Sequence, residues 1–252
     1  MNPLERSLIE KAAVENGWEY VVESTETAVA LASARHKARV VIRPGVSSIR
    51  WAVHLPSGLL RDELAQPSQW KQMPDGVFLV PDIEQLAQLL RRIAELAFSL
   101  PDQAALTYAA KVEEELAAIH SFETEAERLV RQRVGQETFR QALLDYWCGA
   151  CAVTGIDVRE VLRASHAKPW AACANDSERL NVFNGLLLTA NLDALFDRGL
   201  ITFDNHGVLR CSSRITRSQL KLLTIQNDLK LRWVSLNHQV FLSWHRENVF
   251  VC

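Results

Sequence analysis

The hydrophobic pattern of the first 120 residues predicts both helices and strands. Apolar residues recur at helical spacing from Pro3, so we expect a helix that Asn2 caps and Gly17 ends. Short runs rich in β-branched and aromatic residues follow, separated by polar and turn residues. They predict an antiparallel β-meander whose strands lie at 18–22, 27–33, 39–42 and 49–54, with a fifth at 77–80 after a loop.

Helical periodicity returns after Pro81. A broad apolar face runs to Ala97, Pro101 interrupts it, and a further helix continues to Ile119. The next segment is charged and poor in strand formers, which favours a helical connector. We therefore expect an α+β fold in three parts, namely an N-terminal meander with flanking helices (1–120), a connector (121–138) and a C-terminal domain (139–252).

Composition narrows the class of protein. The chain has 252 residues, of which 48% are hydrophobic and 23% are charged, values typical of globular proteins rather than disordered, collagen-like or coiled-coil chains. The net charge is −2, but residues 1–120 hold 12 Lys and Arg against 16 Asp and Glu, and residues 121–252 hold 16 against 14. A polyanionic partner is therefore expected at the C-terminal half.

The sequence also gives expectations for the cellular location of the protein and for the redox state of its cysteines. We expect no membrane span, because no run of about 18 uncharged apolar residues occurs. We also expect no secretory signal, because no basic stretch precedes an apolar core at the N-terminus. The five cysteines are odd in number and lie in the second half, which fits a reducing compartment. A cytoplasmic protein is expected.

One stretch of the C-terminal half concentrates candidate chemistry. It consists of three blocks, Cys151-Ala-Val-Thr-Gly155, Leu162-Arg-Ala-Ser-His-Ala-Lys-Pro-Trp170, and the run from Asn184 to Ile201. The pattern predicts a strand that ends at His166, a long loop, a tight turn at Asn184-Gly185 and a strand at 186–188. A short helix, capped by Thr189 and ended by Gly199, should follow.

Two acids share one side of that short helix. Asp193 and Asp197 are four residues apart, and like charges at that spacing destabilise an isolated helix by roughly 0.2–0.5 kcal/mol. A divalent cation would turn this repulsion into a binding site. The residues alone also allow an interpretation without catalytic chemistry. In it both acids are solvated, His166 is structural and Asn184 is a turn residue.

The joint spacing of these blocks resembles that of the HNH endonuclease family, which has the ββα-metal fold. The resemblance is strong from Cys151 to Phe203, and a weaker one continues to the segment His245-Arg-Glu-Asn-Val-Phe250. It implies a C-terminal nuclease domain that hydrolyses phosphodiester bonds. It says little about the target.

The resemblance also implies roles for single residues. His166 matches the general base, and Asn184 matches the residue that holds the loop and orients the base. Asp193 and Asp197 match metal-ligand positions, although the first is usually His, and Ser165 stands where other branches often have a metal-binding Asp or His.

Oxygen ligands without a certain nitrogen favour one Mg²⁺ or Mn²⁺ per site over Zn²⁺. Cys148 and Cys151 have zinc spacing, but no second pair follows them, so no zinc is expected.

Several basic side chains flank the expected site. We expect contacts with DNA phosphates from Arg163, Lys168, Arg198 and Arg246. Ordinary surface charge is the alternative. His245 and Arg246 are equally suited to anchoring the C-terminus, and Trp170 is expected to pack beneath the loop.

The expected function is that of a metal-dependent endodeoxyribonuclease acting on double-stranded DNA, in restriction of foreign or modified, for example methylated, DNA. Residues 1–120 show no catalytic constellation, so a targeting or specificity role is expected there. The alternative is a catalytically weak DNA-binding or regulatory protein that retains the HNH fold, which Ser165 and Asp193 favour. A module that delivers a nuclease to a complex is a third possibility. Cutting both strands is simplest with two sites, which suggests a homodimer.

Overall fold

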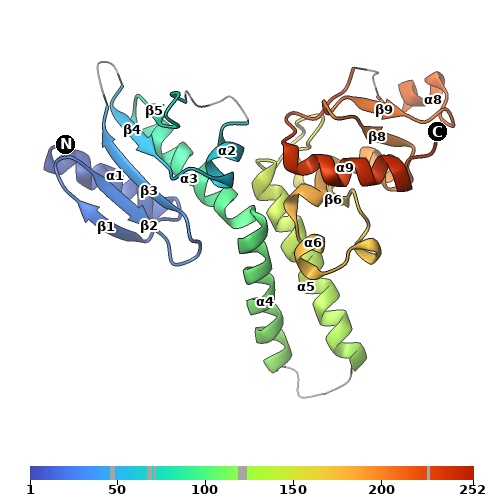
Figure 1. Cartoon of the computed structure of the whole chain (residues 1–252), viewed down its shortest axis with the longest axis horizontal. Helices are drawn as coiled ribbons and strands as arrows, with labels where there is room; N and C mark the ends of the chain where they lie inside the picture. Colours follow the sequence, from blue (N-terminus) through green and yellow to red (C-terminus); the bar gives the residue numbers. More distant parts are fainter. Residues whose placement is uncertain (46–48, 67–69, 71, 119–123, 226–227) are drawn as a thin grey trace. The chain divides into compact units, whose positions relative to one another are not determined.

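The structure is a computed structural model of the 252-residue chain, described here except at residues 46–48, 67–69, 71, 119–123 and 226–227. It contains two compact units, Met1–Phe98 and Ser99–Cys252. Both units mix helices with strands, as expected for an α+β protein (Figure 1).

Unit 1 (Met1–Phe98) is built on the predicted meander. Its first helix, α1 (Pro3–Glu15), begins with a capping box in which Asn2 and Glu5 satisfy each other's backbone amides. Five strands follow in sheet order β1-β2-β3-β4-β5, each antiparallel to its neighbour. They are β1 (Tyr20–Ser24), β2 (Val29–Ala32), β3 (Arg39–Pro44), β4 (Trp51–His54) and β5 (Phe78–Val80).

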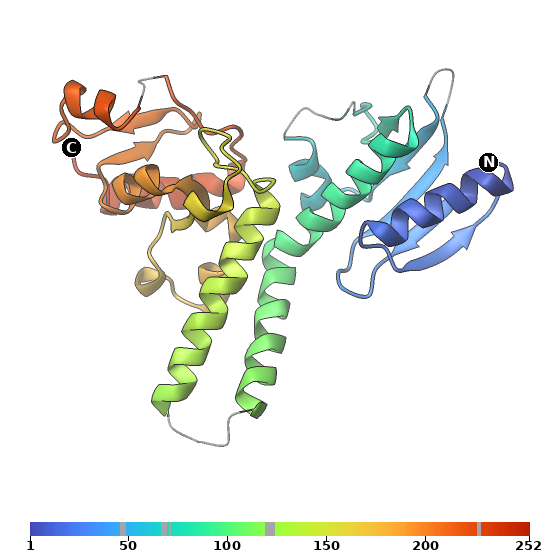
Figure 2. The ribbon, with the colours of Figure 1, turned by 180° about the vertical axis from the view of Figure 1, so that it is seen from behind.

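Helices cover one face of this sheet. Alternate residues of β2 to β5 are buried, and α1 and α3 (Ile83–Ser99) lie on one side of the strands (Figure 2). The indole nitrogen of Trp18 donates to the Leu90 carbonyl at 3.0 Å, which ties the start of the meander to α3. The expected loop between β4 and β5 also contains a short helix, α2 (Leu59–Leu64), because Leu64 is fully buried and anchors it.

Unit 2 (Ser99–Cys252) begins with a pair of long helices. α4 (Pro101–Ala118) and α5 (Thr124–Tyr146) pack side by side (Figure 1). The division between the units at Phe98/Ser99 therefore precedes the boundary that the composition suggested at residue 120. The expected connector 121–138 is, from Thr124 onward, the first part of α5, whereas 121–123 lie outside the described residues. Buried Val134, Phe139 and Leu143 place α5 in the core of unit 2.

The central motif of unit 2 is a strand pair followed by a helix. β6 (Leu162–His166) is antiparallel to β7 (Gly185–Thr189), with His166 opposite Gly185. Thr189 occupies the N-cap position of α7 (Ala190–Asp197), although its hydroxyl bonds Asn191 Oδ1 rather than a backbone amide, and Gly199, at φ 65°, follows the end of the helix. The loop between the strands contains η2 (Trp170–Ala172), α6 (Asp176–Arg179) and η3 (Val182–Asn184), and η1 (Arg159–Val161) precedes β6.

The tight turn expected at Asn184-Gly185 is wrong. Asn184 ends η3, and Gly185 has the extended φ of −143°, so it begins β7 instead of turning the chain. Asn184 is fully buried, since its amide bonds the loop rather than water.

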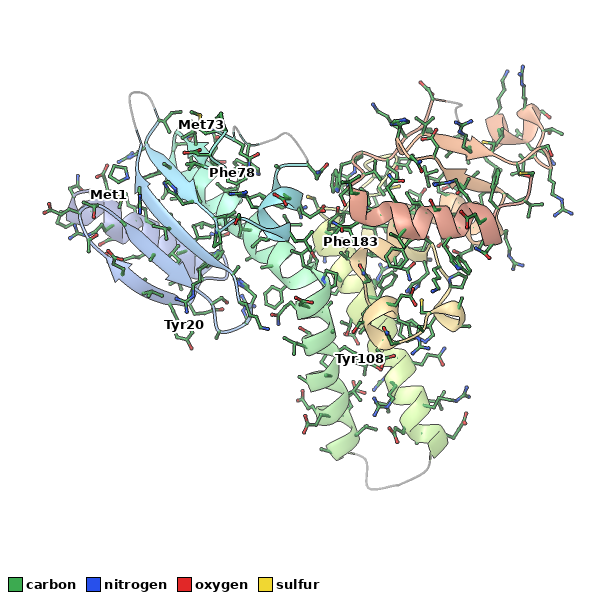
Figure 3. The ribbon with its side chains drawn as sticks, in the orientation of Figure 1. Met1, Tyr20, Met73, Phe78, Tyr108 and Phe183 are labelled. Carbon is green, nitrogen blue, oxygen red and sulfur yellow. The ribbon has the colours of Figure 1, made fainter. Side chains whose placement is uncertain are left out.

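The C-terminal part of unit 2 packs against this motif. β8 (Ile201–Phe203) pairs with β9 (Leu209–Cys211), α8 (Arg217–Leu222) follows, and α9 (Leu236–Asn248) contacts β8 and η3. Phe183 of η3 is buried, and Tyr108 lies on α4 (Figure 3). Among the described residues, no helix combines the length and the hydropathy that crossing a bilayer requires.

Candidate active site

One ring nitrogen of His166 is hydrogen-bonded within the protein. Its Nε2 lies 2.8 Å from the backbone carbonyl oxygen of Arg179. A carbonyl oxygen can only accept a hydrogen bond, so Nε2 carries the hydrogen in the neutral ring. The lone pair of Nδ1 is therefore the one that can accept a proton.

Aromatic side chains and burial control the state of this imidazole. The ring of Phe139 stacks on it, with centroids 3.8 Å apart and planes 12° apart. Trp170 meets its edge at 5.9 Å. Burial lowers the pKa of His166 below its ordinary value, although the hydrogen bond to Arg179 opposes this. The ring is therefore neutral at pH 7, as a general base must be.

Asn184 holds the loop that follows His166. Its Oδ1 accepts from the Lys168 amide at 2.8 Å, and its Nδ2 donates to the carbonyls of Lys168 (3.1 Å) and Glu178 (3.2 Å). The backbone carbonyl of Asn184 also accepts from the Ala167 amide at 2.9 Å. One buried side chain thus links both ends of the loop beside the imidazole.

The two acids of α7 influence each other. Burial, and next the charge of Asp193, raise the pKa of Asp197 to about 6, while Arg198 acts in the opposite direction. Residues 193 and 197 are one turn apart in α7, so both acids are on one side of the helix, as their spacing predicts. Ser165 Oγ donates a hydrogen bond to Asp193, so the acid lies beside the residue that precedes His166.

A cavity of about 290 Å³ is lined by the imidazole of His166 and by one of the two acids. Its walls include Ala164 and His166, which share one face of β6, together with Asp197 of α7. Trp170 and His245 line it as well. The imidazole and one carboxylate therefore face the same space.

The donor set fits a hard divalent cation. Asp193, Asp197 and Ser165 offer oxygen atoms only, which is the donor type that hard divalent cations take. Within the described residues, no three His, Cys, Asp or Glu side chains form a metal-binding group. Asp197 lines the cavity, whereas Asp193 is hydrogen-bonded to Ser165 and neither of these two residues belongs to the cavity wall.

The four expected phosphate contacts lie in different surroundings. Arg163 and Arg198 are exposed, and Arg163 donates to the carbonyls of Glu160 and Leu162. Lys168 forms an ion pair with Glu178 at 2.6 Å, and 18% of its side chain is exposed. Arg246 donates to the Phe203 carbonyl and to Asn205, so it links α9 to the end of β8.

His245 is an anchor of the fold. It is buried, stacks on Phe196 at 3.9 Å, and bonds Thr202 Oγ1 through Nδ1 and the Phe196 carbonyl through Nε2. Burial lowers its pKa to about 4. Of the two roles considered for this residue, the contacts favour anchoring the C-terminal helix.

The motif spacing did not identify Phe139 or Arg179. Phe139 belongs to α5, far upstream of the motif, and Arg179 contributes a backbone carbonyl, a group that every residue has. The apolar spacing of Phe139, Leu143 and Tyr146 indicates a buried helix face, but no sequence signal specifies an imidazole as its partner.

Comparison with known proteins agrees with this location. Residues 151–204 match the family model described as HNH endonuclease. The matched segment contains β6, β7 and α7, with all five residues expected at the catalytic and metal positions. No curated protein matches the chain.

Proposed function

We propose, on the premise that residues 151–204 belong to the HNH endonuclease family, that this protein is a metal-dependent DNA endonuclease with a ββα-metal site. One observation carries the proposal: His166 of β6 and Asp197 of α7 line the same cavity. A neutral imidazole that shares a cavity with a carboxylate suits metal-assisted hydrolysis of a phosphodiester bond.

In the proposed reaction His166 is the general base. Its Nε2 hydrogen bond to Arg179 fixes the tautomer, so Nδ1 takes the proton of the attacking water. Asn184 keeps the loop after His166 in place, which keeps this nitrogen directed at the substrate. Both assignments agree with the roles that the family resemblance implies.

Asp193, Asp197 and Ser165 would hold one Mg²⁺ or Mn²⁺. When bound, the cation stabilises the negative charge that develops on the scissile phosphate and on the leaving oxygen. Arg163 and Arg198 are the exposed cations nearest in sequence to the site residues, so we assign them to phosphate contacts that position DNA without reading its sequence. Lys168 and Arg246 reach DNA only by exchanging the protein partners they have.

Unit 1 is proposed as the targeting module of a restriction or defence enzyme for foreign or modified DNA. Arg35 pairs with Glu19 and Arg50 with Glu5, whereas Arg39 and Arg43 lie exposed on β3. In register, Arg39 is opposite Ala32, which in turn is opposite the exposed Tyr20 (Figure 3). Cationic and aromatic groups on a floor of small residues suit contact with a nucleic acid.

The test of the nuclease is a plasmid assay. Purified protein is incubated with DNA from methylating and nonmethylating hosts in Mg²⁺, Mn²⁺ or EDTA. We expect cleavage only with a cation, loss of at least 100-fold in rate for His166→Ala, and no change for His206→Ala, which alters an exposed histidine of unit 2. Wild-type rates in His166→Ala would contradict the assignment.

The same assay tests the remaining alternatives. Tight DNA binding without cleavage under any cation would identify a DNA-binding or regulatory protein instead. A difference between the two plasmids would support recognition of modified DNA. Double-strand cuts whose rate depends on the square of the protein concentration would support the proposed homodimer.

A further inference from the structure

Helix α5 contacts the matched nuclease segment although it lies outside that segment. Arg140 donates to the Leu162 carbonyl at 2.8 Å and to the Arg159 carbonyl at 3.1 Å, which fixes the beginning of β6. Phe139, the residue before Arg140 in the same helix, lies at the other end of β6, where its ring stacks on the ring of His166.

The stack depends on two close approaches that require glycine. A Cβ atom on Gly185 would lie 2.4 Å from Cζ of Phe139, so only glycine in β7 allows the ring to enter beside His166. A Cβ atom on Gly135 would lie 2.4 Å from Cη2 of Trp170, whose ring meets the edge of the same imidazole. Residues of α5 thus shape both aromatic walls of His166, Phe139 through its ring and Gly135 through its lack of a side chain.

These walls limit the motions of the imidazole. A face-to-face partner at 3.8 Å blocks rotation of the ring about its Cβ–Cγ bond, because any intermediate angle would drive ring atoms into Phe139. The hydrogen bond to the Arg179 carbonyl then fixes Nε2 as the ring nitrogen that faces the protein. Phe139 is 2% exposed, so it acts through His166 and reaches no substrate itself.

We propose that Phe139 is a positioning residue for the nuclease reaction, in that its stacked ring holds the imidazole of His166 at the angle from which Nδ1 receives the proton of the attacking water. The proposal rests on the function proposed above. It assigns a role in the reaction to a helix that the family match does not include.

The experiment compares Phe139→Leu with Phe203→Leu in the full chain. Phe203 is an equally buried phenylalanine of unit 2 whose ring contacts Phe196 and not His166. Thermal melting establishes that both variants fold. Phe139→Met is the second variant, because an unbranched side chain fills the site if leucine does not.

Three measurements are made on each protein. They are the single-turnover cleavage rate with Mn²⁺ at saturating DNA, the Kd for DNA in EDTA, and the NMR shifts of the His166 ring protons in protein labelled at histidine. We expect Phe139→Leu to cleave at least 10-fold more slowly with an unchanged Kd, since small misplacements of a catalytic group are costly. The ring-current shift of His166 should disappear in this variant and persist in Phe203→Leu.

Each outcome decides between the proposals. Phe139→Leu cleaving as fast as Phe203→Leu, or losing DNA affinity and rate in equal measure, would overturn the positioning role and leave the nuclease intact. A wild-type protein that cleaves no DNA under any cation would overturn the proposed function, and the positioning role with it.

Discussion

The buried amide of Asn184 binds both backbone groups of Lys168, accepting from its N–H at 2.8 Å and donating to its carbonyl at 3.1 Å. This pair of bonds closes the loop between β6 and β7 directly after His166. A side chain that looks like a turn residue in the sequence is therefore an internal brace of the site.

Replacing Asn184 should lower both the free energy of unfolding and the rate of cleavage. Asn184→Ala leaves the backbone groups of Lys168 and Glu178 without their partner, and we expect a loss of about 2–3 kcal/mol in the free energy of unfolding. Urea denaturation measures it. Asn181→Ala, which removes a single capping bond to the Phe183 amide, is the control and should cost only about 1 kcal/mol. Equal losses in the two variants would contradict the role of Asn184.

The acid pair predicts a stability that depends on pH and on cations. Asp197 has a folded-state pKa of about 6 against an ordinary 3.8, so its contribution to stability is complete below pH 3.8 and is lost as pH rises through 6. In EDTA, Asp197→Asn should therefore be more stable than wild type at pH 8 and equal to it near pH 4. The gain should stay below about 1 kcal/mol, because Asp197 is only partly buried and solvent screens its charge.

Addition of Mg²⁺ or Mn²⁺ at pH 8 should reverse this order. A cation that binds only the folded state raises the melting temperature of wild type. Asp197→Asn has one carboxylate fewer and should respond much less. Identical responses of the two proteins would show that Asp197 is no ligand.

His245 should make the protein sensitive to acid. Burial lowers its pKa to about 4, so the stability that it contributes is complete above pH 6.5 and is lost as pH falls towards 4. Wild type should lose about 1.4 kcal/mol per pH unit more than His245→Gln across this window. The comparison isolates His245 because the other buried histidines are present in both proteins. Parallel curves for the two proteins would refute the assignment.

Gly135 should resist substitution even though it lies inside a helix. Alanine is normally favoured there by about 1 kcal/mol, but its Cβ would lie 2.4 Å from Trp170. We expect Gly135→Ala to lower the unfolding free energy by about 1–2 kcal/mol, and Trp170→Phe to recover part of that loss in the double variant. Gln136→Ala, at the next and exposed position of α5, should be neutral. A stabilised Gly135→Ala protein would show that Trp170 moves freely.

Local patterns were sufficient for much of the fold and for part of the site. Asn2, Pro3 and Gly17 mark the ends of α1, and alternation of β-branched residues predicts the five-stranded meander, because caps and strand periodicity act between near neighbours. The spacing of Asp193 and Asp197 on one helix likewise requires no tertiary information. The proposed roles of His166 and Asn184 come from the family resemblance, because neither residue by itself has a local pattern that indicates catalysis.

Tertiary structure decided what surrounds these residues. The sequence cannot specify that Asn184 is an internal brace, that Phe139 stacks on His166, or that the segment after residue 123 is part of unit 2 rather than a connector. Each of these facts depends on which elements pack together. Burial, pKa and ring contacts are set by partners distant in sequence, whereas periodicity and capping are set within a few residues along the chain.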